Sequence, residues 1–298
     1  MDNRWAMLCR LRVEAFNDPD WTWERKLDGD RMSVLVTDNG TTSLLARSGA
    51  SKTDQFPEIR LDLPPESRPA MFDGEVVSAQ GLGFQEFNQR RMNRQRDIES
   101  FARELPAMYV AFDCLMVGGR DIGHLPLAER RRALEAALPA SMDIGPVRVP
   151  AQFRDGVALF EKANELKWEG VVGKRLDEPY LPHRRNWVKV KRWLEGTFSC
   201  VGYTLGCGKR EKTFGALIVQ SDDGKLKAEV GTGFDDATLT SLLEYMRGRS
   251  KSMILVGGAM PAPVGVWVEP FRVKVKYVEV TNAGSLRFPV YLGLDASS

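Results

Sequence analysis

The chain contains the run Trp23-Glu24-Arg25-Lys26-Leu27-Asp28-Gly29-Asp30-Arg31. The residues before it are β-prone from Trp21, Asp28 to Asp30 supply a bend, and residues 32–36 alternate, so the run predicts a tight loop between two strands. Most lysines on such a hairpin are solvated. A lysine that acts as a nucleophile must instead become neutral, although its ordinary pKa is near 10.4. Neighbouring cations, including a metal ion, can lower that pKa.

Composition indicates an ordinary globular protein. Of the 298 residues, 43% are hydrophobic and 28% charged, and the net charge is +2. We find neither an apolar stretch of about 18 residues nor a signal-peptide pattern, which predicts a cytoplasmic protein without a membrane span. The four cysteines form no C-x-x-C pair and there are only two histidines. The sequence therefore argues against a disulfide framework, a zinc site and a histidine-rich metal site.

The first two thirds of the chain mix strand and helix patterns. Strands are expected at 42–47, 70–78 and 108–117, and helices at 126–138 and 155–166. This mixture predicts an α+β domain with antiparallel sheets.

The sequence pattern changes near residue 193, where short strand patterns and glycine-rich turns begin. Strands are then expected at 198–203, 216–219, 225–230, 264–268 and 273–280, with one helix capped by Asp235. Strands around a single helix in roughly 100 residues suit an OB-fold barrel. We therefore expect two domains, 1–193 and 194–298.

Five further short motifs follow Lys26 in the chain. They are Arg47-Ser48-Gly49, Phe72-Asp73-Gly74-Glu75, Tyr109-Val110-Ala111-Phe112-Asp113, Glu169-Gly170-Val171-Val172-Gly173-Lys174 and Trp187-Val188-Lys189-Val190-Lys191. Each alone has a structural explanation: Phe112 suits a packed strand, and the two lysines of the last motif suit a half-exposed strand. Together, in this order, they resemble the motifs of the ATP-dependent DNA ligases, within the superfamily that includes the mRNA-capping enzymes.

The resemblance implies a role for each matched side chain. Lys26 would be the nucleophile that keeps AMP as a phosphoramidate, Glu24 would meet the adenine amino group, and Phe112 would stack on the purine. The other implied nucleotide contacts are Arg47 with phosphate, Glu75 with ribose hydroxyls or metal, Lys189 and Lys191 with the triphosphate, and Glu169 with a metal ion. Arg31 offers a planar fork suited to ribose or phosphate. The implied cofactors are ATP and Mg²⁺ (or Mn²⁺).

The resemblance is strongest to minimal bacterial ligases of the end-joining and repair type. It implies an α+β adenylyltransferase domain with ATP-grasp-like antiparallel sheets, followed by a β-barrel OB-fold domain. It also implies a monomer that binds nicked duplex DNA and acts with DNA-repair or end-joining proteins. Candidate DNA contacts are the basic side chains Arg90, Arg91, Arg94, Lys209, Arg210 and Lys212. A solvated helix face remains the alternative for the first three.

The end of the chain departs from the family pattern. Family members usually carry a basic R-x-D-K motif near the C-terminus, whereas no basic residue follows Arg287 here. Arg287 is the possible remnant of this sixth motif, and slow self-adenylylation is expected. Two alternatives remain open: an RNA ligase or capping guanylyltransferase, and a catalytically weakened OB-type module that binds DNA breaks.

Overall fold

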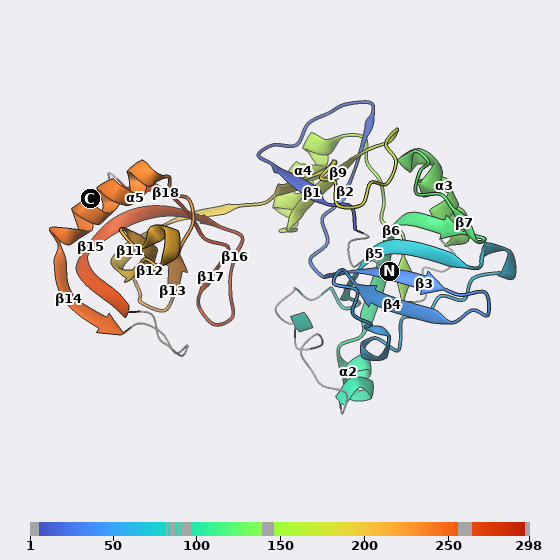
Figure 1. The fold of residues 1–298 in the computed structure, drawn as a ribbon, viewed down its shortest axis with the longest axis horizontal. Coiled ribbons are helices and arrows are strands. Elements are labelled where there is room, and N and C mark those ends of the chain that lie inside the picture. The colour runs from blue at the N-terminus through green and yellow to red at the C-terminus, as the bar shows by residue number, and fades with distance from the viewer. Residues whose placement is uncertain are drawn as a thin grey trace. The chain divides into compact units, whose positions relative to one another are not determined.

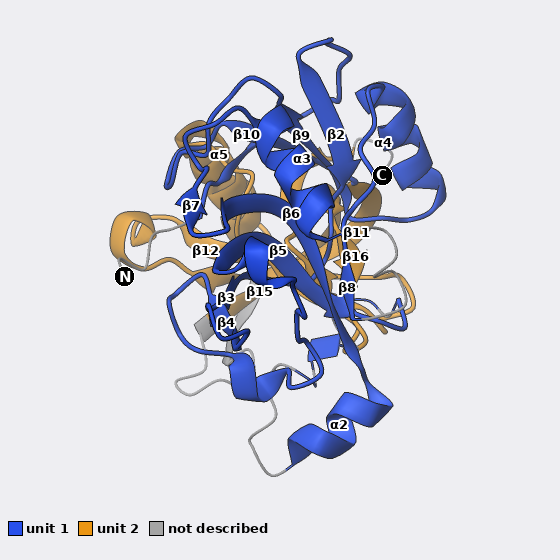
Figure 2. Ribbon diagram, turned by 90° about the vertical axis from the view of Figure 1, so that its right-hand side faces the viewer, with its two compact units in different colours: residues 1–192 blue, residues 193–298 orange. Residues whose placement is uncertain are grey.

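The computed structural model describes residues 6–81, 83, 87, 88, 90, 97–138, 146–255 and 264–295. The chain divides into two compact units, Met1–Arg192 and Trp193–Ser298 (Figure 2). No helix in the described part of the chain is long and apolar enough to cross a membrane.

Unit 1 contains two sheets (Figure 1). The larger has the order β4 (Thr42–Ala46), β3 (Asp30–Val36), β5 (Ala70–Ser78), β6 (Ala107–Val117) and β7 (Arg120–Asp121), with β8 (Val147–Arg148) also pairing with β6. The smaller has the order β1 (Cys9–Arg12), β10 (Trp187–Lys191), β9 (Gly170–Arg175) and β2 (Trp21–Arg25). The helices are α2 (Ile98–Glu104), α3 (Leu127–Ala137) and α4 (Gly156–Glu165), and two 3₁₀ turns are Thr53–Gln55 and Pro65–Ser67.

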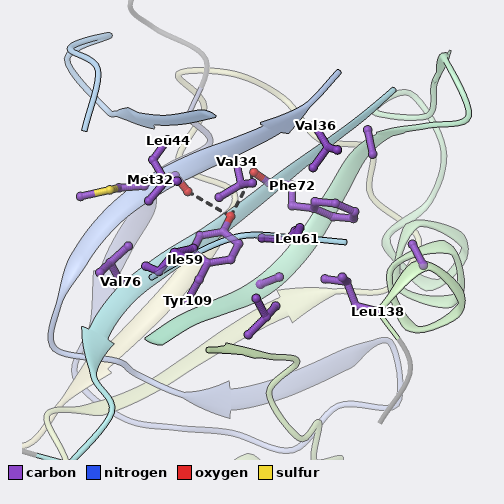
Figure 3. Packing of buried hydrophobic residues seen from close by; sticks show 14 of the residues in the cluster. Met32, Val34, Val36, Leu44, Ile59, Leu61, Phe72, Val76, Tyr109 and Leu138 are labelled. Atoms are coloured by element: carbon purple, nitrogen blue, oxygen red, sulfur yellow. Dashed lines mark hydrogen bonds between the residues drawn. The ribbon is translucent and has the colours of Figure 1, made fainter. Parts of the chain in front are cut away.

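The larger sheet buries one face in an apolar core. Alternate residues of β3 point into it, including Met32 and Val34, because side chains of a strand alternate between faces. Tyr109 lies in this core, and its hydroxyl donates to the carbonyls of Met32 (3.2 Å) and Phe72 (3.1 Å) (Figure 3). The opposite face of β3 carries Arg31 and Ser33. This face carries the polar side chains of the site described below.

Two glycines of the quoted motifs are required by close packing. A Cβ on Gly29 would lie 2.2 Å from the carbonyl oxygen of Val76, and one on Gly74 would lie 2.4 Å from the ring of Tyr109. Neither neighbour is a flexible side-chain end that can move away. The glycines of Lys-x-Asp-Gly and Phe-Asp-Gly-Glu therefore let the loop and β5 approach their neighbours.

The smaller sheet packs against α4. Trp23, Val171 and Val188 from the sheet meet Leu159 of the helix in a second apolar cluster. The Asp155 side chain begins α4 by accepting a hydrogen bond from the backbone N–H of Ala158 (2.9 Å). This packing fixes β2 and β9, the two strands that lead into the Lys26 loop and the Glu169 motif.

Unit 2 is rich in strands, with one α-helix among its described residues. Its main sheet has the order β13 (Lys227–Val230), β12 (Phe214–Gln220), β11 (Leu194–Leu205), β15 (Val264–Tyr277) and β14 (Ser250–Leu255), and β18 (Val290–Leu294) also pairs with β15. The helix α5 (Asp236–Arg247) buries one apolar face, and a short pair, β16 (Glu279–Val280) and β17 (Leu286–Arg287), follows β15. The two units therefore follow the predicted order, a mixed α+β unit and then a β-rich unit around one described helix.

One predicted feature of unit 2 is wrong. Residues 264–268 and 273–280 were expected as two strands, yet β15 continues through Pro270 as one strand to Tyr277, and Glu279–Val280 form the separate β16. A register shift against β11 absorbs the interruption: Cys200 faces Phe271, while Gly202 faces Trp267. A bulge of this kind accommodates a proline, which cannot donate to the ladder.

Candidate active site

Lys26 lies one residue beyond β2, against the start of β9. Its backbone N–H donates to the carbonyl of Gly170 (2.9 Å), and its Nζ donates to the Leu27 carbonyl (3.2 Å) and to Glu169 Oε2. Burial lowers the pKa of Lys26, but the charge and hydrogen bond of Glu169, together with the charges of Glu75 and Asp28, outweigh burial and raise the pKa. In this arrangement Lys26 is an ammonium held by a carboxylate.

Two carboxylates flank the lysine. Glu169 also pairs with Lys191, at 3.2 Å between Oε1 and Nζ. Glu75 accepts from the backbone N–H of Gly29 (3.2 Å), and burial raises its pKa to about 7 even though Lys26 lies nearby. The charge of Glu169 adds to that increase. The two carboxylates therefore lie close enough to affect each other's protonation.

A pocket of about 320 Å³ opens beside Lys26, within the size range of small-molecule sites. Its wall includes Glu24, Lys26, Arg31, Arg47, Glu75, Phe112 and Lys189 among the predicted site residues, together with Cys9, Lys174, Arg185 and Trp187. Burial lowers the pKa of Lys189, and the positive charges of Lys191 and Lys26 lower it further. Cations from four segments thus face one small cavity.

The pocket wall also carries a buried ion pair. Glu24 is only 3% exposed, and its Oε2 lies 2.7 Å from Lys174 Nζ. Its Oε1 accepts from Gln152 (3.1 Å) and lies 3.6 Å from Arg131 Nη1. The Lys174 ammonium also lies 4.5 Å from the ring centroid of Phe112. A charged, hydrogen-bonding edge therefore adjoins an aromatic ring.

The guanidinium group of Arg31 forms its hydrogen bonds within the protein. Its Nε and Nη2 donate to the two oxygens of Asp73 at 3.0 and 2.6 Å, and Asp73 is fully buried. The Tyr180 hydroxyl donates to Asp73 Oδ2 (2.7 Å) and lies 3.3 Å from Arg31 Nη2. Arg31 lines the pocket, but the fork that was expected to receive ribose or phosphate is occupied by Asp73.

Comparison with known proteins identifies the family. The family model described as "ATP dependent DNA ligase domain" matches residues 7–191, and that described as "ATP dependent DNA ligase C terminal region" matches residues 210–296. The chain belongs to the ATP-dependent DNA ligase family.

Similar proteins include bacterial end-joining proteins. The multifunctional non-homologous end joining protein LigD of Pseudomonas aeruginosa is 33% identical over 92% of this chain and 33% of its own length. The chain spans about a third of the length of the first curated relatives it matches. The crystal structure of the ligase domain of Mycobacterium tuberculosis LigD is 26% identical, with a TM-score of 0.55 over 100% of this chain and 96% of that one. A mycobacterial DNA ligase D complexed with ATP and MES has the same identity and coverage, with a TM-score of 0.53.

Sequence reasoning gave no role to several side chains of this ligase pocket. Lys174 and Trp187 stand within quoted motifs, and strand alternation could have placed Lys174 on the same face of β9 as Val172. The links from Tyr180 to Asp73 and Arg31 join residues 107 and 149 positions apart. No local pattern signals such links.

The candidate DNA contacts of the chain have different surroundings. Arg90 is 1% exposed and its Nη2 donates to both oxygens of Glu58 (2.9 and 2.8 Å), so the prediction that it contacts phosphate does not fit its position. Its neighbours Arg91 and Arg94 lie outside the described residues. Lys209 and Lys212 are exposed, whereas Arg210 is half-buried.

Two of the predicted site residues are arginines whose side chains bond within unit 2. Arg210 Nη1 donates to the carbonyls of Gly215 (2.9 Å) and Gly231 (2.8 Å), which fixes the turn that presents the two lysines. Arg287, the possible sixth-motif remnant, donates to Glu279 Oε1 at 2.9 Å across the β16–β17 pair.

Proposed function

We propose that this chain is an ATP-dependent DNA ligase that seals nicks in duplex DNA through a lysyl-AMP intermediate. The observation that carries the proposal is the position of Lys26: its amine contacts Glu169 and lies in a pocket with Arg47, Lys189 and Glu75. The solved mycobacterial ligase D complexed with ATP, which this chain resembles over its whole length, supports ATP as the donor.

The first step forms a bond between Lys26 Nζ and the α-phosphorus of ATP, and the bond from that phosphorus to pyrophosphate breaks. Lys26 must lose a proton before it attacks, and the neighbouring cations of the pocket favour that loss. Arg47 and Lys189 face the charge that develops on the phosphate oxygens. Pyrophosphate leaves with the electrons of the broken bond.

The later steps pass AMP to DNA. An oxygen of the 5′-phosphate at the nick attacks the AMP phosphorus, and the lysine–phosphorus bond breaks to restore the amine. The 3′-hydroxyl then attacks the 5′-phosphorus and AMP leaves. Each step exchanges one phosphorus bond for another, so stabilisation of phosphate charge serves all three.

Glu75 and Glu169 fit a Mg²⁺ ion. Both offer hard carboxylate oxygens, and burial, with a smaller contribution from the charge of Glu169, raises the pKa of Glu75. Among the described residues, no group of three or more acidic, cysteine or histidine side chains forms a ready-made metal site. The two glutamates would therefore hold the ion together with phosphate oxygens. Bound there, Mg²⁺ would supply positive charge against the triphosphate.

The base end of the pocket suits adenine. Glu24 has acceptor capacity for the adenine amino group, and Phe112 offers a ring beside it for stacking. Guanine presents a carbonyl oxygen at the same place, which would face a carboxylate. We therefore infer a preference for ATP over GTP.

Intact mass after incubation with ATP, GTP or NAD⁺ and Mg²⁺ tests the proposal. We expect an adduct of one AMP with ATP alone, and none with Lys26→Ala, because only an amine at this position can form the phosphoramidate. The matched control is Lys52→Ala, a nearby lysine outside this pocket that bonds Gln55. Lys26→Ala should still join a nick that is already 5′-adenylated. An AMP adduct on Lys26→Ala would refute the assignment.

A further inference from the structure

Three segments of unit 1 each place two adjacent residues at the nucleophile. The pairs are Arg25 with Lys26, Trp168 with Glu169, and Lys191 with Arg192. One member of each pair belongs to the site already described: Glu169 accepts from Lys26 Nζ, and its Oε1 lies 3.2 Å from Lys191 Nζ. The other members, Arg25, Trp168 and Arg192, form a second cluster of contacts next to the first.

Trp168 is the centre of this second cluster. The Arg25 guanidinium carbon lies 4.8 Å from the centroid of the Trp168 ring, within the range of a cation–π contact. Arg192 Nε donates to the Trp168 carbonyl (3.2 Å). The ring also packs against the apolar cluster that the smaller sheet shares with α4, which includes Trp23 and Leu159. The side chain and the backbone of Trp168 are therefore both anchored.

The end of α4 places Trp168 there. Lys167 has a φ of 55°, in the left-handed region that a residue with a side chain rarely adopts. Its N–H donates to the Asn164 carbonyl (3.3 Å), and the Trp168 N–H donates to the Ala163 carbonyl (2.8 Å). These are the two bonds of a Schellman motif, in which the left-handed residue is usually glycine. A lysine persists there because the surrounding packing fixes the backbone.

The backbone of Glu169 is fixed by the segments on both sides of it. The Arg192 N–H donates to the Glu169 carbonyl (2.9 Å), and the Lys26 N–H donates to the Gly170 carbonyl (2.9 Å). Trp168 anchors the preceding residue, although it does not line the nucleotide pocket. A shift of Trp168 would therefore move the Glu169 carboxylate, and with it the Lys26 amine that this carboxylate holds.

We propose that Trp168 is a positioning residue for AMP transfer. Its stack with Arg25 and its anchorage at the end of α4 fix Glu169, and through Glu169 they fix the direction of the Lys26 amine. The inference rests on the proposed function, because it needs AMP transfer to Lys26. A residue that aligns the nucleophile without touching ATP changes the rate of bond formation and leaves ATP binding almost unchanged.

Single-turnover adduct formation, followed by intact mass over a series of ATP concentrations, measures the two quantities separately. Trp168→Ala should lower the maximal rate about ten- to hundredfold, the effect of a misplacement of about 1 Å. The half-saturating ATP concentration should stay within about threefold of the wild-type value. Trp168→Phe keeps a ring under Arg25 and should restore most of the rate. The matched control is Tyr245→Ala, which removes a similar stack with Arg249 in unit 2 (4.5 Å) and should leave the rate unchanged.

A double variant tests the stack itself. Arg25 also lines the nucleotide pocket, so Arg25→Met alone does not separate positioning from contact with ATP. If Arg25 acts through the ring, Arg25→Met should add little to the loss already caused by Trp168→Ala, because both changes break one contact. Urea unfolding midpoints show whether each variant is folded. If Trp168→Ala is not, Arg192→Met, which removes the bond to the Trp168 carbonyl, should lower the maximal rate at an unchanged half-saturating ATP concentration.

Three results would overturn the positioning role. They are an unchanged maximal rate in folded Trp168→Ala, a half-saturating ATP concentration that rises as much as the rate falls, and additive effects of Arg25→Met and Trp168→Ala. In each of these cases the wild-type chain still forms the adduct, so the proposed function stands. Absence of an AMP adduct on the wild-type chain would overturn the proposed function, and the positioning role with it.

Discussion

Breaking the Glu24–Lys174 pair should strongly destabilise unit 1. The change is Lys174→Met, which keeps the length of the side chain but removes its charge. Lys174 and Glu24 are 1% and 3% exposed, and their charged atoms are 2.7 Å apart. At an effective dielectric constant of about 20, this distance corresponds to a gross attraction of about 6 kcal/mol, much of which offsets desolvation.

The net cost follows from what remains around Glu24. Removal of one partner from a buried pair typically costs about 3–5 kcal/mol, because the other charge is left uncompensated. Gln152 at 3.1 Å and Arg131 at 3.6 Å still support Glu24, so we expect the lower end, about 3 kcal/mol. Removing both charges, in Glu24→Gln with Lys174→Met, should cost less than the sum of the single changes by about 2 kcal/mol.

Urea unfolding of the full chain measures these differences through tryptophan fluorescence, since Trp21, Trp23 and Trp187 are buried in unit 1. The control is Asp177→Asn, which breaks the exposed pair with Arg175 and should leave the midpoint nearly unchanged. If the effects of Glu24→Gln and Lys174→Met add within about 0.5 kcal/mol, the two charges are not coupled and the reasoning fails.

Three other predictions follow from the described contacts. Glu24→Gln should reduce the preference for ATP over GTP about tenfold or more, measured as rates of adduct formation, because the carboxylate acceptor for the adenine amino group is lost; an unchanged ratio would contradict this. Lys209→Ala with Lys212→Ala should flatten the salt dependence of nicked-DNA binding by up to about 0.9 per lost phosphate contact, whereas Lys225→Ala should not. Asp235 accepts a hydrogen bond from Thr238 at the start of α5, which lowers the pKa of Asp235. Its contribution to the stability of the fold is therefore complete above the ordinary pKa of aspartate and is lost as the pH falls through the lowered pKa. Asp235→Asn should remove that dependence from acid unfolding of the chain.

Local sequence predicted much of the fold and selected several residues that the structure brings together around Lys26. Lys26, Glu75 and Glu169 were chosen from short motifs, and the structure brings them together. Such motifs can be recognised in the sequence because each places a glycine or a charged residue at a fixed position within one loop or strand. Gly29 and Gly74 are examples, since each sits where no Cβ fits.

The ion pairs that connect these motifs were not predictable from the sequence. Glu24 was expected to contact the adenine amino group, yet its carboxylate is paired with Lys174 from β9. Arg31 was expected to present its fork to a ligand, yet Asp73 from β5 occupies that fork. Arg90 was expected to contact DNA, yet its side chain is buried and paired with Glu58. In all three cases the partner comes from a distant segment, and one sequence does not show which opposite charges will meet.

These pairings divide the charged residues of the pocket into two groups. Arg31 and Lys174 are bound to buried carboxylates, so their charges are largely balanced and their positions fixed. Arg47 is exposed in the turn after β4, and Lys189 is half-buried with a lowered pKa. A phosphate group arriving from solvent gains most from cations whose charge is not already balanced by a buried acid, because only their field extends into the pocket. The fixed pairs therefore shape the base end of the pocket, and the exposed cations attract the phosphates.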